Sequence, residues 1–332
     1  MAEGVDEWTA DRAVVVMNPH SGGGKVARFR LADRARETGA KVILTSPDQD
    51  AASLAKAAIA GGATVLGVAG GDGTVSAVAA VAAKAGRPLV VIPAGTRNHF
   101  ARDLGLNTKN PASAVSALGA GDVARVDLGQ VGSRTFINNV SLGAYADALL
   151  TPGYRDAKAR TFAQIAPDYL AGQQWINASV ETPQGEVEFP QVVLVSNNPY
   201  DISTLPRLGR RFALDTGHLG GIVLKRPDGA RPPDLLPRLG RELRRGHTGP
   251  PGEGLITWTA MRITLRSTAP QLPAGIDGEV ITLDLPIVCQ IRPGALRILL
   301  PRTKAPDPTK PPAQAARPGR RPTRLSIRTE RG

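Results

Sequence analysis

The sequence has few of the residues that build disulfide frameworks or cysteine-rich metal sites. One cysteine, Cys289, stands among 332 residues, which excludes an internal disulfide and a cysteine-rich metal site. Cys289 lies in an apolar, strand-like run, so we expect a buried and unreactive thiol. Aromatic residues make up only 4% of the chain, so Val, Leu, Ile and Ala must fill most of the core.

Long apolar runs are also missing. The longest ones, such as VVVM and VLGVA, are far too short for a transmembrane helix, which takes about 20 residues. The N-terminal stretch MAEGVDEW is acidic and polar, and it has neither the basic nor the apolar region of a secretory signal. We therefore expect a cytoplasmic protein whose only contact with a membrane is peripheral.

Acidic residues are outnumbered by basic ones. The chain has 29 Asp and Glu against 41 Lys and Arg, for a formal net charge of +12. Nine of the basic residues and two of the acidic ones lie in the Pro-rich tail 302–332, which buries too little apolar surface to fold. We predict a disordered basic tail whose partner is an anionic membrane surface, with a solvated tail without a partner as the alternative. Nucleic acid ranks last, because the tail lacks interleaved aromatic residues.

Up to about residue 122, short apolar runs alternate with segments of helical spacing. Apolar strands that alternate with helices imply a parallel sheet that is covered by helices on both faces. We therefore predict an α/β domain over 11–122. Its expected strands are 13–18, 41–46, 64–70 and 88–95, and its expected helices are 25–36, 48–61 and 74–86.

After residue 122 the pattern changes to short alternating segments that are typical of antiparallel strands. Gly132-Ser133 joins two of these segments, which is a hairpin signal. We predict an antiparallel β-sandwich over 123–294. A helical insert near 154–171 and a Pro-, Gly- and Arg-rich segment at 227–254 interrupt it.

The stretch GGDGT has more glycine than a core or a simple turn needs. Gly70, Gly71, Asp72 and Gly73 follow the third strand and precede a helix, at the edge where open α/β sheets bind ligands. Bare glycines let phosphates approach backbone N–H groups, and the helix N-terminus adds positive potential. Asp72 would repel a phosphate, so we expect it to hold a bridging Mg²⁺ ion or a ribose hydroxyl. The alternative is a tight strand–helix turn in which Asp72 is a capping residue.

Two further loops follow strands in the same way. NPHSGGGK (18–25) is not a P-loop, because Val26 follows the lysine and the first glycine is missing. Its Ser21, glycines and Lys25 could still cradle a phosphate, and a flexible loop with a solvated lysine is the alternative. In PAGTRN (93–98), Gly95-Thr96 opens a predicted helix, and we expect Arg97 and Asn98 to point toward the same crevice. The alternative is a cap that is followed by an ordinary amphipathic helix.

A fourth motif, GIDGEV (275–280), lies in the second half of the chain. Asp277 and Glu279 are two residues apart, so in a strand they would share one face. The alternative is an ordinary hairpin with Asp277-Gly278 at the tip of a type I′ turn.

The chain contains four motifs in a fixed order: NPxSGxxK, GGDGT, PxGTxN and a late DGE. This ordered set resembles the diacylglycerol kinase catalytic-domain family, and the resemblance runs from about residue 11 to 300. That family includes bacterial lipid kinases, diacylglycerol kinases and sphingosine kinases. GGDGT also occurs in NAD kinases and, loosely, in phosphofructokinases, which share the nucleotide-binding fold. The resemblance implies an ATP- and Mg²⁺-dependent lipid kinase that acts on diacylglycerol or a related lipid. It also implies that the α/β domain binds the nucleotide, and that a last strand at 295–301 returns to this domain.

The resemblance further implies roles for the motif residues. Asp277 would be the general base toward the lipid hydroxyl, Glu279 would support the site, and Asp72 would bind the metal. The nucleotide and its phosphates would be held by Asn18, Ser21, Gly22, Lys25, Gly70, Gly71, Asp72, Gly73, Thr74, Thr96 and Asn98.

Two positions depart from the family pattern. His99 replaces the acid that often follows GTxN, and Gly220 replaces the second acid of a D-x-G-x-L-D motif that begins here at Asp215. We therefore expect no structural metal at the second motif. A soluble-substrate kinase of the NAD kinase type and a catalytically inactive nucleotide- or lipid-binding regulator are the alternative functions.

Overall fold

A computed structural model describes residues 12–46, 48–143, 175–201, 210–225 and 254–302. The described residues all belong to one compact unit. The predicted helical insert at 154–171, the Arg-rich segment as far as residue 253 and the tail after residue 302 lie outside the described residues.

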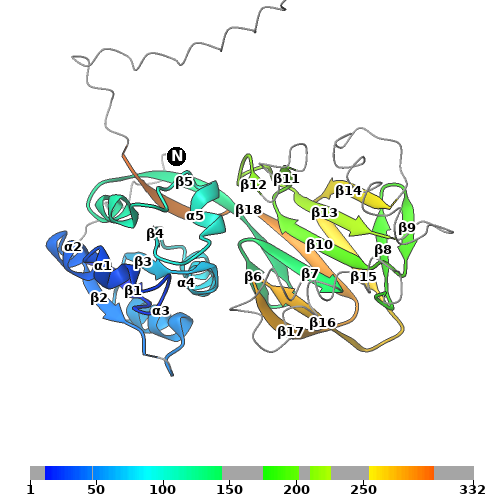
Figure 1. Ribbon diagram of the computed structural model, residues 1–332, viewed down its shortest axis with the longest axis horizontal. Helices are drawn as coiled ribbons and strands as arrows, with labels where there is room; N and C mark the ends of the chain where they lie inside the picture. The colour runs from blue at the N-terminus through cyan, green and yellow to red at the C-terminus, as the bar shows by residue number, and fades with distance from the viewer. Residues whose placement is uncertain (1–11, 47, 144–174, 202–209, 226–253, 303–332) are drawn as a thin grey trace, which may run out of the picture. The chain divides into compact units, whose positions relative to one another are not determined.

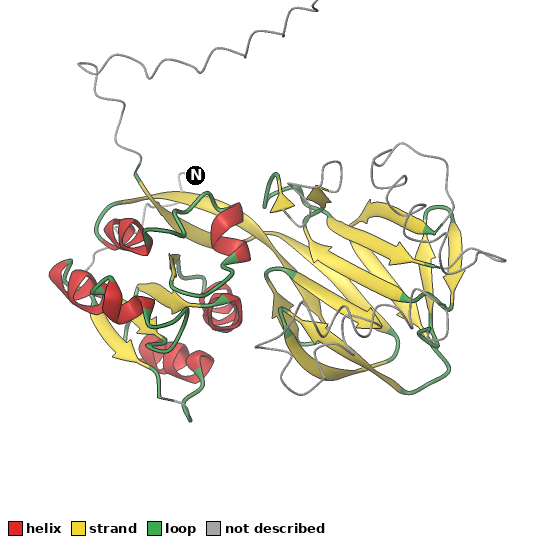
Figure 2. Ribbon diagram, viewed as in Figure 1, coloured by secondary structure: helices red, strands yellow, loops and turns green. Residues whose placement is uncertain are grey.

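The first part of the fold is a parallel sheet with helices on both faces (Figures 1 and 2). Its four strands pair in the order β2-β1-β3-β4, and they confirm the four predicted strands to within two residues at each end. Their bounds are β1 (Ala13–Met17), β2 (Lys41–Leu44), β3 (Val65–Gly70) and β4 (Leu89–Pro93).

Residues alternate along these strands between two apolar cores. Val14 and Val16 of β1 pack with α3 (Ala51–Ala60) and α4 (Asp72–Lys84) on one face. Val15 and Met17 pack on the other face, in a core shared with α1, α2 and a 3₁₀ helix, η2. Because both faces are covered, each strand reads as a continuous apolar run. These remaining helices are α1 (Lys25–Arg28), α2 (Leu31–Glu37) and η2 (Pro111–Leu118).

The single helix predicted over 25–36 is wrong. Two short helices, α1 and α2, take its place, because Arg30 has a φ of 50°. This left-handed conformation is incompatible with a continuous α-helix. The helix predicted over 48–61 is confirmed as α3, with Asp50 as its N-cap residue accepting hydrogen bonds from the N–H groups of Ala52 and Ser53.

Two long strands continue the sheet beyond β4. β18 (Ile287–Pro301) pairs in parallel with β4 and antiparallel with β5 (Gly121–Val131). The strand expected at 295–301 is therefore the second half of a longer strand. β5 also pairs with β6 (Arg134–Phe136), which confirms the hairpin at Gly132-Ser133. The sheet ends with β15 (Arg262–Arg266), β8 (Ser179–Thr182) and β9 (Gly185–Glu188).

A second, fully antiparallel sheet packs with these last strands around a third apolar core. Cys289 belongs to this core, which confirms that the cysteine is buried, and burial raises the pKa of its thiol to about 12. The predicted fold class, an α/β parallel-sheet domain with an antiparallel β-sandwich, is confirmed. In sheet order, the six strands are β14 (Leu255–Ala260), β13 (Leu219–Leu224), β10 (Val192–Asn197), β7 (Asn139–Gly143), β16 (Gln271–Ile276) and β17 (Glu279–Asp284).

No helix among the described residues combines the length and the apolar character that a membrane crossing requires.

Candidate functional site

Three loops leave the carboxyl ends of the parallel strands, and their backbones touch one another at glycines. A Cβ atom on Gly95 would lie 2.4 Å from Cα of Gly71. A Cβ atom on Gly22 would lie 2.2 Å from the carbonyl oxygen of Ala94. Only glycine allows such close approaches. These glycines therefore join the loops, whereas Gly23 has no heavy atom within 4 Å of its Cβ position.

Two polar side chains hold these loops in place. The Lys25 ammonium donates hydrogen bonds to the carbonyl oxygens of Gly95 (2.9 Å) and Thr108 (3.4 Å). Burial, and secondarily the charge of Arg28, lowers the pKa of Lys25. Asn98 has a φ of 52°, and its side chain bonds both the N–H (2.8 Å) and the carbonyl oxygen (2.8 Å) of Gly95. Both predicted ligand-binding side chains are therefore engaged with the loop backbone.

Asp72, the predicted metal ligand, is the first residue of α4, and its carboxylate caps another helix. It accepts hydrogen bonds from the backbone N–H groups of His99 (3.1 Å) and Phe100 (3.2 Å). These two residues begin α5 (His99–Asp103), so the helix predicted at Gly95-Thr96 starts later. A carboxylate offers about four acceptor positions, so Asp72 keeps capacity for a cation.

His99, which replaces the family's acid, is half-buried beside Asp72. Burial lowers the pKa of its imidazole, and the charges of Arg102 and Arg97 lower it further against the opposing effect of Asp72. An Arg102 nitrogen lies 2.9 Å from Nδ1 of His99. Since a guanidinium can only donate, Nδ1 is the acceptor and the neutral ring carries its proton on Nε2.

A pocket of about 380 Å³ opens at the same edge of the sheet. It brings together four of the predicted site residues, namely Asn18, Gly73, Thr74 and Glu279. The other predicted site residues do not line this pocket. Seven further residues line the pocket without having been predicted from the sequence: His20, Thr45, Ser46, Gln49, Asp50, Ala51 and Ala77.

One pattern in the sequence could have predicted two of these seven lining residues. Thr45 and Ser46 follow the second predicted strand, and the carboxyl ends of parallel strands meet at one edge of a sheet. Sequence analysis treated the loops after the first, third and fourth strands as binding loops but not this one.

The Glu279 carboxylate lies beside the first turn of α4. Its Oε1 is 3.6 Å from the position that a Cβ atom on Gly73 would occupy. α4 has 13 residues, and the N–H groups of a first helical turn have no partner within their helix. The positive end of the helix stabilises a carboxylate there. A phosphate at the same place would repel Glu279 unless a cation lay between them.

Asp277 lies at the tip of the hairpin between β16 and β17. Ile276 pairs with Glu279, and the two residues between them have positive φ, 48° at Asp277 and 92° at Gly278. This confirms the type I′ turn that the sequence allowed as an alternative. Burial raises the pKa of the Asp277 carboxyl, and its hydrogen bonds, that of Ser76 first, oppose the rise.

Four donors surround the Asp277 carboxylate. Oδ2 accepts from the Ser76 hydroxyl (2.5 Å) and from Ile137 N (2.9 Å). Oδ1 accepts from Asn138 N (2.8 Å) and Asn139 N (3.1 Å). These bonds occupy the roughly four acceptor positions of a carboxylate. The implied role of general base stays a prediction, and it requires one donor to move.

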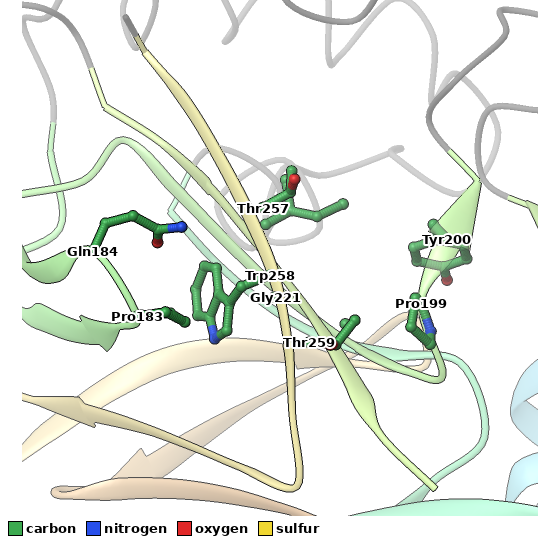
Figure 3. Close-up of a pocket in the computed structure, with 10 residues that line it drawn as sticks. Pro183, Gln184, Pro199, Tyr200, Gly221, Thr257, Trp258 and Thr259 are labelled. Atoms are coloured by element: carbon green, nitrogen blue, oxygen red, sulfur yellow. The ribbon is translucent and has the colours of Figure 1, made fainter. Parts of the chain in front are cut away.

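A second pocket, of about 360 Å³, lies on β13 and β14 of the antiparallel sheet (Figure 3). Pro183 and Gln184 lie at the end nearer the Trp258 ring, and Pro199 and Tyr200 lie at the opposite end. None of the predicted site residues lines this pocket.

The segment that departs from the bacterial metal motif is tightly packed. A Cβ atom on Gly220 would lie 2.6 Å from Oγ of Ser196 and 2.8 Å from Cα of Pro199, so the missing acid has no room. Within the described ranges, no group of three or more His, Cys, Asp and Glu side chains could hold a metal ion.

Comparison with known sequences agrees with the motifs. Residues 12–131 match the model of the diacylglycerol kinase catalytic domain. A diacylglycerol kinase of Mycobacterium tuberculosis is 39% identical over 125 residues, which are 36% of this chain and 40% of that protein. A protein of Pseudomonas aeruginosa named probable lipid kinase YegS-like is 28% identical over 304 residues, covering 88% of this chain and 95% of that protein.

Comparison with solved structures supports the same fold. A diacylglycerol kinase from Bacillus anthracis matches with a TM-score of 0.61 at 18% identity, over 87% of this chain and 97% of that one. At this identity the match concerns the fold alone. The family model and the two relatives agree with the site geometry: residues 12–131 match a diacylglycerol kinase catalytic domain, and the chain is similar to a probable lipid kinase over 88% of its length.

Proposed function

We propose that this chain is an ATP- and Mg²⁺-dependent lipid kinase that phosphorylates the hydroxyl of diacylglycerol or a related lipid. The observation that carries the proposal is the pocket at the carboxyl edge of the parallel sheet, which joins the first turn of α4 to Glu279. The match to the diacylglycerol kinase catalytic domain favours a lipid acceptor over the NAD kinase alternative.

The nucleotide fits this pocket in size and chemistry. Its volume of about 380 Å³ lies within the usual range for small-molecule sites. Thr45, Ser46 and Gln49 supply hydroxyl and amide groups that can bond a base or a ribose. Gly73 and Thr74 supply N–H groups at the positive end of α4, where phosphates bind well.

Asp72 and Glu279 are the residues that would hold Mg²⁺. They flank the first turn of α4, and Mg²⁺ in kinases is bound by one or two carboxylates together with substrate phosphates. When bound, the ion neutralises the charge of the transferring phosphoryl group.

Asp277 is the proposed acceptor of the proton from the lipid hydroxyl. Of its four donors, three are backbone N–H groups that the fold fixes, and the fourth is the Ser76 hydroxyl. A hydroxyl can rotate its proton away, so Ser76 is the donor that frees an acceptor position. The raised pKa of Asp277 makes its carboxylate a better base than an ordinary aspartate.

The basic tail after residue 302 supports a peripheral membrane location. It carries half of the net positive charge of the chain, and anionic lipid attracts such segments. An enzyme held at the membrane surface in this way would reach a lipid substrate in the bilayer.

Substitution of a pocket residue tests the nucleotide site. Ser46 is exposed and lines the pocket, so Ser46→Trp should fill space there without disturbing the core. We expect the affinity for Mg²⁺–ATP, measured by calorimetry, to fall about tenfold. Ser116→Trp, on the exposed side of η2, is the matched control and should leave the affinity unchanged. Equal affinities in the parent and Ser46→Trp would remove the nucleotide from this pocket.

A further inference from the structure

Arg211, in the short strand β12 (Arg210–Arg211), is a buried cation that no motif contains. It is the only Lys or Arg in the buried class within the ranges that the structure describes. Its guanidinium lies 6.0 Å from the centre of the Phe100 ring and 5.8 Å from that of Tyr200. Nε is 2.8 Å from a carboxylate oxygen of Asp103, and both side chains are 1% exposed or less.

The other two nitrogens of the guanidinium hold a segment of the β-sandwich. Nη1 donates to the carbonyl oxygens of Ile137 (2.5 Å) and Asn197 (2.9 Å), and Nη2 donates to Oδ1 of Asn138 (2.9 Å). The N–H groups of residues 137–139 all point to Asp277. This segment is therefore fixed between a buried cation on its carbonyl side and a carboxylate on its N–H side.

These contacts close into a ring. Asp72 of α4 caps the start of α5, and Asp103 at the end of α5 binds Arg211. Arg211 binds residues 137–138, whose N–H groups bind Asp277. The Ser76 hydroxyl of α4, one turn after Asp72, completes the ring by donating to Asp277. Each hydrogen bond or ion pair that joins two elements of this ring has a charged side chain as one partner.

We propose that Arg211 is a positioning residue for phosphoryl transfer. It fixes the GGDGT turn, which bears Asp72, relative to the hairpin that bears Asp277 and Glu279. The inference rests on the proposed kinase function, because these two elements are the two sides of the proposed site. Within the described part of the chain, Arg211 does not line the nucleotide pocket, and its hydrogen bonds go to Asp103 and to residues 137, 138 and 197 rather than to the Asp277 carboxylate.

The geometry explains why arginine is required at this position. The three nitrogens of Arg211 together reach acceptors on three different segments, at Asp103, at residues 137–138 and at Asn197, which a planar guanidinium fork can do and a single ammonium cannot. A lysine at position 211 would keep a positive charge beside Asp103, but it would lose the separate nitrogens that bond residues 137, 138 and 197. Displacements of about 1 Å at a reaction centre cost roughly 100-fold in rate, so the loss should appear in turnover.

Arg211→Lys is the test, with Arg266→Lys as the matched control. Arg266 makes an exposed ion pair with Glu181 through Nε (3.0 Å) in the same β-sandwich. At a temperature where circular dichroism shows both variants folded, we expect kcat of Arg211→Lys to fall about tenfold or more. The KM for ATP should stay within about threefold, because the fork does not reach the pocket. A folded Arg211→Lys with parental kcat, or with kcat and KM changed equally, would overturn the proposal.

A second variant covers the case in which Arg211→Lys does not fold. Asn138→Ala removes the partner of Nη2 and leaves the ion pair with Asp103 intact. We expect a smaller fall in kcat in the same direction, and an unchanged kcat in the folded variant would count against the proposal.

Amide exchange separates this inference from the kinase proposal. If the parent transfers no phosphate, the kinase proposal fails while the mechanical claim can still be tested. The amides of residues 137–139, and those of His99 and Phe100 at the far side of the ring, should then exchange about tenfold faster in Arg211→Lys. They should be unchanged in Arg266→Lys. Parental exchange at all of these amides in Arg211→Lys would refute the positioning role.

Discussion

The Ser76 hydroxyl donates a 2.5 Å hydrogen bond to the Asp277 carboxylate, 201 positions further along the chain. This bond links the helix that follows GGDGT to the hairpin that carries DGE. It joins the two motif-bearing elements directly, through their side chains.

Ser76→Ala should destabilise the protein by about 2 kcal/mol, because hydrogen bonds to charged groups contribute more than neutral ones. The free energy of unfolding in urea measures this. Ser116→Ala removes a comparable hydroxyl from an exposed position, where Oγ donates to the Ser113 carbonyl oxygen, and should change stability by less than about 0.5 kcal/mol. Equal losses in the two variants would show that the Ser76–Asp277 bond contributes nothing specific.

Asp72→Asn should have two separable effects. An amide cannot accept from both His99 N and Phe100 N as the carboxylate does, so stability should fall by about 1 kcal/mol. Removal of a proposed Mg²⁺ ligand should lower kcat/KM for ATP about 100-fold. Thermal unfolding and steady-state kinetics report these effects independently. Parental kinetics would exclude the metal role, and parental stability would contradict the capping contact.

His99 should make the protein less stable in acid. Its pKa is lowered in the fold from the ordinary value of 6.5, so the unfolded chain binds the proton more readily. The associated stability is complete above pH 6.5 and is lost as the pH falls through the folded pKa. Urea unfolding between pH 7.5 and 5 should show a smaller decline for His99→Asn than for the parent. His20→Asn, at an exposed position, should leave the slope unchanged, and a parental slope in His99→Asn would disprove this origin.

Removal of the tail after Arg302 should weaken binding to anionic vesicles. The cut leaves β18 and the Arg302–Asp122 ion pair in place, so the sheet keeps its last strand. Each lost cation contributes at most about 1 kcal/mol near an anionic surface, and salt reduces this contribution. Vesicle sedimentation at low and high salt measures the effect, while turnover on detergent-solubilised lipid should not change. Undiminished vesicle binding at low salt would leave the tail without a membrane role.

The parts of the fold that the sequence predicts well have strong local patterns. The doubly buried strands read as apolar runs, and Asp277-Gly278 has the residues that a type I′ turn needs. The break in the helix at Arg30 and the continuity of β18 past the irregularity between Arg292 and Leu296 depend on tertiary packing. No periodic pattern in the sequence predicts the helix break or the continuous strand.

The site was only partly predictable for a related reason. Glycine-rich motifs mark loops, but they do not tell which polar groups face a ligand and which hold the loop. Lys25 and Asn98 proved to bond the loop backbone. The role of Arg211 could not be predicted from the sequence, because its partners Asp103 and Ile137 lie 108 and 74 positions away. Only the folded chain brings these residues together.

Phosphate transfer to lipid tests the central claim most directly. The purified full chain would be incubated with Mg²⁺ and ATP labelled in the γ-phosphate, first with diacylglycerol in mixed micelles and then with a total-lipid extract. We predict a labelled lipid whose formation requires Mg²⁺ and falls about 100-fold or more in Asp277→Asn, the expected cost of losing a general base. A folded parent protein that binds ATP but labels no lipid in either preparation would contradict the account, and label transferred to NAD instead would identify the soluble-substrate kinase.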